Sequence, residues 1–225
     1  MLADAAGLQA LRDLGARSVP VVSRGEKWVD GQALQALADF VGVNWTHRML
    51  SPADLTKRIN TVLTAVARFG AQLPQDKLAT MLPNGFRSYV SLITHVGQIV
   101  EAYLDYVEHG VRLEEAAYVK PVPKSVVMPA DIAAFELSVL ERFNAWWKKS
   151  GDKADYASPA NVYYGEQTLH EFMERSAWHA AQHTRQVQLL LETLGIAPDR
   201  PLAKEDLAGL PLPENVWDDK MVFTA

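Results

Sequence analysis

Two histidines in a helix-forming segment could bind a metal ion together. His179 and His183 lie four residues apart, so at about 100° per residue they are only about 40° apart around a helix, one turn above each other. Helical His pairs with this spacing occur in zinc sites. The interval reads His-Ala-Ala-Gln-His and lacks the glutamate of the HExxH motif, so a zincin-type protease is excluded.

A third histidine completes the candidate site. His95 lies in the middle of another helical segment, with Ile93 and Val96 beside it, and this apolar setting predicts that its ring points inward. Three imidazoles from two helices suit Zn²⁺, Ni²⁺, Co²⁺ or Fe²⁺ and leave a coordination position for water, a thiol or a carbonyl oxygen. We therefore predict that His95, His179 and His183 bind a divalent transition metal.

Each of these histidines also has a simpler interpretation. His95 alone would be a hydrogen-bonded core histidine, and an isolated pair at this spacing can arise by coincidence. The other three histidines, His47, His109 and His170, are predicted to be exposed to solvent. The metal interpretation therefore depends on the three rings meeting in space.

Composition limits the remaining chemistry. The 225 residues contain no cysteine, which excludes disulfides, thiolate ligands, redox dithiols and a cysteine nucleophile. A thiol in the reaction must therefore come from a separate small molecule. The net charge is −5 and no Lys/Arg cluster is present, so nucleic-acid binding is disfavoured. Without an apolar run near ~20 residues or a signal peptide, we expect a cytoplasmic protein with no membrane association.

Long helices must position the histidines. Capping residues, apolar stripes and prolines predict four of them, over residues 52–73, 88–107, 129–150 and 168–194. His95 belongs to the second of these helices, and the His179–His183 pair belongs to the fourth. The long proline-containing connection before the third helix predicts a crossover. The predicted fold class is mainly α: an up-down four-helix bundle over residues 44–196.

Both ends of the chain are expected to pack on this bundle. Residues 1–43 read as helix, strand, strand, helix and are too few to bury a good core alone, so they should pack against the bundle or against a second copy. The resulting apolar surface predicts a homodimer. Residues 197–225 are predicted to form an extended C-terminal tail that packs on the bundle through Leu210, Leu212 and Trp217.

A likeness to a known family covers roughly residues 51–194. The segment Ser176-Ala-Trp-His-Ala-Ala-Gln-His-Thr-Arg-Gln186 resembles the last-helix motif of the DinB-like superfamily, and Leu92-Ile-Thr-His-Val-Gly-Gln98 resembles that family's second helix around its histidine. The resemblance implies a four-helix bundle with a three-His metal site, whose ligands would be His95, His179 and His183. It also implies a thiol-dependent S-transferase or isomerase that uses bacillithiol, mycothiol or glutathione.

The N-terminal segment, residues 1–43, resembles a second family. Gly15-Ala-Arg-Ser-Val-Pro-Val-Val22, followed by Trp28-Val-Asp-Gly31 and an apolar helix, is similar to the C-terminal half of a glutaredoxin. The resemblance implies that Pro20 is cis and that Val19 and Pro20 bind a glutathione-type thiol. The strand and helix that would carry the Cys motif are missing, so redox activity is excluded. We interpret this truncated, half-thioredoxin-like α/β segment first as a docking unit, and otherwise as a half that pairs with its twin or as part of a thiol pocket.

These observations favour a metal-dependent transferase that activates a small thiol or water against a small-molecule substrate. A metal-dependent hydrolase and a non-enzymatic metal- or ligand-binding protein stay open. A transferase needs a cationic or backbone-rich pocket for the carboxylates of the thiol, whereas a hydrolase needs an inward general base. Glu101 and Glu171 qualify only if they point inward. Gln186 is interpreted either as orienting a ligand or as bonding a neighbouring helix.

Overall fold

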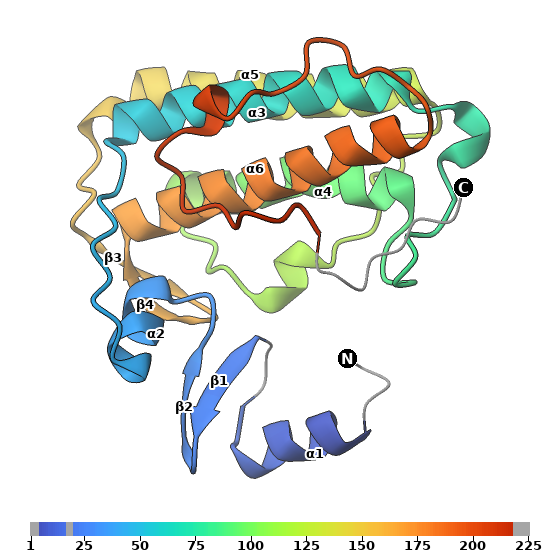
Figure 1. The fold of residues 1–225 in the computed structure, drawn as a ribbon. Helices are drawn as coiled ribbons and strands as arrows, with labels where there is room; N and C mark the ends of the chain where they lie inside the picture. Colours follow the sequence, from blue (N-terminus) through green and yellow to red (C-terminus); the bar gives the residue numbers. More distant parts are fainter. Residues whose placement is uncertain (1–4, 17–19, 218–225) are drawn as a thin grey trace.

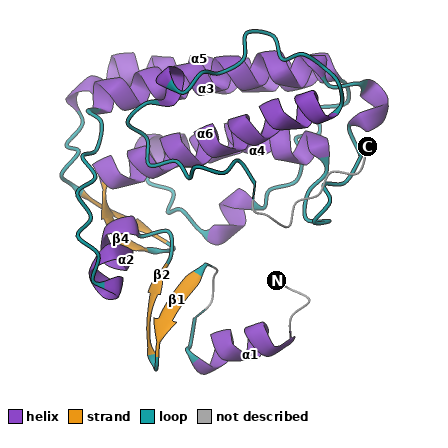
Figure 2. Ribbon diagram, in the orientation of Figure 1, coloured by secondary structure: helices purple, strands orange, loops and turns teal. Residues whose placement is uncertain are grey.

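The computed structural model describes residues 5–16 and 20–217. These residues are mainly helical and contain two small antiparallel sheets of two strands each (Figures 1 and 2). The predicted fold class, mainly α, is confirmed. None of the described helices is long and apolar enough to cross a membrane.

Four of the described helices exceed twenty residues: α3 (Pro52–Gln72), α4 (Tyr89–His109), α5 (Pro129–Lys149) and α6 (Leu169–Thr193). Together they are called the helical body. The side chains of Ser51, Ser88 and Thr168 each accept a hydrogen bond from the backbone N–H three residues further on, which satisfies a donor that the first turn of a helix leaves unpaired. All four helices begin within one residue of their predicted starts.

Helix α3 packs against α5 and α6, and α4 packs against the same two helices (Figure 1). Asn60 in the first half of α3 is hydrogen-bonded to Asn144 near the end of α5, and Gly70 near the end of α3 contacts Ile132 near the start of α5. These two helices are therefore antiparallel. A Cβ at Gly70 would lie 2.5 Å from Ile132 Cγ2, so the absence of a side chain allows this close approach.

Helices α4 and α5 run in the same direction. The backbone N–H of Gly97 donates to Glu136, and further along both helices Arg142 donates to Asp105. The order of directions is therefore up, down, down, up, and the simple up-down alternation predicted for the bundle is wrong at this connection. The cause is the predicted crossover over residues 110–128, which carries the chain back along the helical body before α5 begins.

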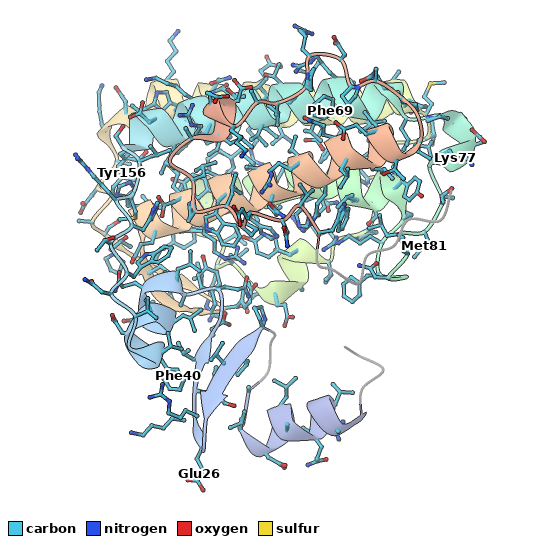
Figure 3. All side chains as sticks on the ribbon, in the orientation of Figure 1. Glu26, Phe40, Phe69, Lys77, Met81 and Tyr156 are labelled. Carbon is cyan, nitrogen blue, oxygen red and sulfur yellow. The ribbon has the colours of Figure 1, made fainter. Side chains whose placement is uncertain are left out.

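Apolar side chains fill the space between the four helices, Phe69 among them (Figure 3). The largest of the fully buried side chains are aromatic: Tyr103, Phe69, Phe143 and Phe172. Phe172 of α6 meets Tyr103 of α4 edge to face, with ring centroids 5.1 Å apart, an arrangement that aromatic pairs prefer. This packing fixes α4 and α6, the two helices that carry the three histidines, against each other.

The N-terminal segment contains α1 (Ala5–Asp13), β1 (Val21–Arg24), β2 (Lys27–Asp30) and α2 (Leu34–Val41), and its two strands pair as an antiparallel hairpin. Before α2 begins at Leu34, the Asp30 carboxylate accepts the N–H of Gln32, a local bond that competes with helix formation. Figure 1 shows the hairpin and α1 projecting from the helical body.

A second hairpin, which the sequence did not reveal, precedes α6. It consists of β3 (Pro159–Val162) and β4 (Gly165–Thr168). Short 3₁₀ turns occur at η1 (Gln75–Lys77), η2 (Glu115–Tyr118), η3 (Gly151–Lys153) and η4 (Glu205–Leu207). The described part of the tail, 197–217, runs back over the helical body: Arg68 donates to the carbonyls of Asp199 and Arg200, and Arg185 donates to those of Pro213 and Glu214.

Candidate metal centre

The structure brings His95, His179 and His183 together, and they are called the triad. Because α4 and α6 are antiparallel, His95 in the first half of α4 faces the His179–His183 pair in the middle of α6. The ring centroid of His95 lies 5.4 Å from that of His179 and 4.9 Å from that of His183. One ring nitrogen from each residue lies within 4.8 Å of the others. The convergence on which the metal interpretation depends is therefore present.

The distances within the helical pair suit a shared cation. The Nε2 atoms of His179 and His183 are 3.1 Å apart. Two nitrogens that bind one Zn²⁺ at about 2.0–2.1 Å with tetrahedral angles lie about 3.3 Å apart. In addition, Nδ1 of His95 and Nδ1 of His179 are buried without a hydrogen-bond partner among the described residues. Such atoms are rare in proteins, and here they accompany a donor set that fits a transition metal.

Gln186 orients one of the rings. Its side-chain Oε1 lies 2.6 Å from Nδ1 of His183, and its Nε2 donates to the carbonyl of Val216 in the tail. This contact favours the His183 tautomer with hydrogen on Nδ1, which leaves the lone pair of Nε2 for a metal. Of the two interpretations given for Gln186, the contact supports the one in which it orients a ligand.

Burial keeps the triad neutral. His95 is only 1% exposed, and His179 and His183 are half-buried. Desolvation is the largest cause that lowers the pKa of His95 and His179 far below the usual range, and it lowers the pKa of His183 to about 4. Neutral imidazoles bind a metal without first losing a proton, so all three are ready to act as ligands at neutral pH.

Two arginines flank the triad. Nη2 of Arg87 lies 3.4 Å from Nε2 of His95 and donates to the carbonyl of Tyr118. Arg175, one turn before His179 on α6, is 4% exposed. The cluster of possible ligands found among the described residues consists of the three histidines and contains no carboxylate. A dication in this setting would have no negative protein ligand, so the site favours an anionic ligand from solution.

Arg175 also connects the triad to the N-terminal segment. It donates to the hydroxyl of Tyr118 at 2.9 Å and is hydrogen-bonded to Oε1 of Gln32. The ring of Tyr118 in turn meets His179 edge to face at 5.1 Å. Tyr163, in the turn between β3 and β4, contacts both Gln32 and Arg175. The buried guanidinium of Arg175 thus contacts both the N-terminal segment and the residues beside the triad.

A cavity of about 340 Å³ opens beside the triad. It is lined by His183 and Gln186 from α6, by Phe86 and Arg87 from the loop before α4, and by Trp217 from the tail. It is called the triad cavity. Trp217 was predicted only to anchor the tail, and Arg87 was not predicted to be a site residue. The position of Arg87 directly before the cap of α4 was a weak signal for a residue at the site.

The two candidate acids do not supply a general base at the triad. Glu171 accepts hydrogen bonds from the backbone and hydroxyl of Thr168 and so caps α6. Glu101 is half-buried. Burial is the largest cause that raises its pKa, and Lys120 and Asp105 are among its charged neighbours. Neither residue acts on the pKa of a triad histidine.

The other three histidines were predicted to be exposed to solvent, and this prediction is confirmed for one of them. His109 is exposed as expected. His47, predicted to be exposed, lies 2.9 Å from the Glu174 carboxylate and its side chain is 17% exposed. His170, also predicted to be exposed, is half-buried and contacts the carbonyl of Leu50 at 2.8 Å. These two predictions were wrong because the connection between α2 and α3 packs along the start of α6.

Of the two predicted thiol-binding residues, only Pro20 belongs to the described residues. Val19 lies outside the described residues. Pro20 is exposed, and its carbonyl accepts the N–H of Gly31 at 2.8 Å. It does not line the triad cavity. Comparison with known proteins supplies no further assignment, because no protein-family model and no curated protein matches the chain.

Proposed function

We propose that this chain is a divalent-metal-dependent enzyme of the DinB-like type, with His95, His179 and His183 as ligands of Zn²⁺, Ni²⁺ or Fe²⁺. The observation that carries the proposal is the convergence of three neutral imidazoles whose ring nitrogens lie within 4.8 Å of one another. The proposal includes a four-helix-bundle fold for residues 44–196 and a half-thioredoxin-like fold for residues 1–43. The sequence resemblances described above support both fold assignments.

We further propose that the reaction is transfer of a small thiol of the glutathione type. A Lewis-acidic metal lowers the pKa of a thiol or water bound to it. The chain contributes three neutral ligands, a cavity open to small molecules, and the guanidinium of Arg87 beside His95. The cationic surroundings favour an anionic ligand such as a thiolate. A hydrolase has less support because the histidine cluster contains no carboxylate among the described residues and Glu171 caps α6.

Two further proposals concern the whole molecule. We propose a homodimer, supported by apolar side chains that the N-terminal segment and its linker leave in water: Trp28 is 39%, Val43 58% and Trp45 37% exposed. Light scattering should give twice the chain mass, and a monomer at micromolar concentration would refute this proposal. We also propose cytoplasmic location, supported by a sequence that contains no cysteine.

The metal proposal is tested by elemental analysis of protein purified without a metal-affinity step. We expect about one equivalent of a transition metal in the parent and its loss in His179→Ala and in His183→Ala. His109→Ala is the matched control, because this histidine is exposed at the end of α4, and it should keep the metal. A parent without metal that also gains no thermal stability from Zn²⁺ or Ni²⁺ would refute the proposal.

The reaction is tested on the metal-loaded protein. Glutathione consumption is followed with a panel of small electrophiles, and we expect turnover in the parent that a chelator abolishes and added metal restores. Metal binding without turnover of glutathione would overturn the transferase assignment alone and would leave the hydrolase and the non-enzymatic metal- or ligand-binding protein.

A further inference from the structure

Arg87 occupies the triad cavity without a negative partner. It enters from the loop before α4, where Leu82 N–H donates to the Arg87 carbonyl at 2.8 Å and fixes the backbone. Its guanidinium is half-buried and contacts the Tyr118 carbonyl and His95. No described carboxylate forms an ion pair with it. Burying a cation that has only neutral partners costs free energy. An anion bound in the cavity would offset this cost by pairing with the Arg87 guanidinium.

The rest of the cavity combines apolar side chains with the amides of Asn84 and Gln186. Phe86, Leu92 and Trp217 line it beside Arg87 and His183. Phe86 is 61% exposed, so its ring is accessible to a molecule in the cavity. The volume of about 340 Å³ is at the small end of ligand pockets. The cavity therefore suits a compact molecule with an apolar body.

The geometry points to a substrate class: we infer that the triad cavity binds a small organic acid whose carboxylate pairs with Arg87 and whose apolar body packs on Phe86 and Trp217. The guanidinium fork of arginine matches a carboxylate with two parallel hydrogen bonds. His183 lines the same cavity, so one compact molecule reaches both Arg87 and the triad. This inference rests on the proposed metal centre and adds the charge and shape of the molecule bound there.

The test uses a matched pair of probes and the Co²⁺-loaded full chain. The probes are 2-mercapto-3-phenylpropanoate and its uncharged amide, and the visible absorption of Co²⁺ reports binding of their sulfur. In the parent, the acid should bind about 10- to 100-fold more tightly than the amide, because a hydrogen bond between charged groups contributes that much. In Arg87→Gln this ratio should fall to about one, with the affinity for the amide unchanged.

Two further variants make the result specific. Arg87→Lys keeps the positive charge and should retain part of the preference for the acid, whereas a purely structural role of Arg87 would not produce this rescue. Arg112→Gln removes an exposed arginine that pairs with Glu114, and it should bind both probes like the parent.

The outcomes separate the inference from the metal centre. Co²⁺ bound by the parent with equal affinity for acid and amide overturns the inference and leaves the metal centre intact. An equal loss of affinity for both probes in Arg87→Gln also overturns it, since Arg87 would then only shape the cavity. Failure of the parent to bind Co²⁺ overturns the metal centre, and the inference with it.

Discussion

The helical body and the N-terminal segment differ sharply in how they exclude water. In the helical body, long rows of apolar side chains are fully buried, whereas the buried side chains of the described part of the N-terminal segment are Asp30, Ala33 and Ala38. The triad lies entirely in the region with the large core. A site that needs fixed geometry is held by rigid elements, and in the described part of the N-terminal segment Gln32 connects to it through hydrogen bonds to Arg175 and Tyr163.

The first prediction tests this difference in burial directly. Phe172→Ala should lower the free energy of unfolding by about 3–5 kcal/mol, because it leaves a cavity among fully buried aromatic rings. Trp28→Ala in β2 should cost less than about 1 kcal/mol, because Trp28 is 39% exposed. Urea unfolding of both variants measures the two values. Equal losses would contradict the contrast between the regions.

Much of the helical body could be predicted from local rules. The caps at Ser51, Ser88 and Thr168 depend on residues within one turn, so the helix starts were predicted to within one residue. The spacing of His179 and His183 is likewise a property of a single helix. Local patterns of this kind are sufficient to assign the three histidines to the two correct helices, although they contain no information about contacts between the helices.

The rest depended on contacts between distant segments. The parallel direction of α4 and α5 follows from the path of residues 110–128, which has no periodic pattern to read. Arg87 and Trp217 are 130 positions apart and meet only because the tail returns to the loop before α4. The hairpin β3–β4 was missed because its strands, Pro-Ala-Asn-Val and Gly-Glu-Gln-Thr, have few of the β-branched and aromatic residues that are typical of strands.

The second prediction concerns a carboxyl group buried in the helical body. Glu136 is 0% exposed and accepts the Gly97 N–H, while its Oε2 has no partner among the described residues. Desolvation raises its pKa well above the usual 4.5. The folded state therefore keeps the proton after the unfolded chain has lost it, and stability should fall by about 1.4 kcal/mol per pH unit as pH rises from 4.5 towards the folded pKa.

Replacement by an amide isolates this contribution. Glu136→Gln removes the titrating group, so its stability relative to the parent should increase as pH rises from 4.5 to 8. Urea unfolding at several pH values measures this increase. Glu141→Gln, an exposed position on the same helix, should follow the parent. If all three proteins show the same pH dependence, the carboxyl group is already ionised in the folded state.

The third prediction concerns the hydrogen bond that orients His183 in the helical body. Gln186→Ala removes the acceptor that lies 2.6 Å from Nδ1 of His183. If the triad binds a metal, affinity should weaken about 10- to 100-fold, as for other losses of a group that orients a histidine ligand. Competition with a chelator for Zn²⁺ measures the change. Gln188→Ala, two residues further along α6, should leave the affinity unchanged.

The smallest expected effect lies at the junction between the two regions. Arg175→Met removes the hydrogen bond to Gln32, so amides of residues 27–41 should exchange hydrogen about tenfold faster, as expected when a bond of roughly 1.4 kcal/mol no longer opposes local opening. Because Arg175 also contacts Tyr118, Gln32→Ala is needed as a variant that changes the N-terminal side alone. Both variants should speed exchange in residues 27–41 and leave α4 protected. If Gln32→Ala had no effect there, the N-terminal segment would be held on the helical body by contacts other than this junction.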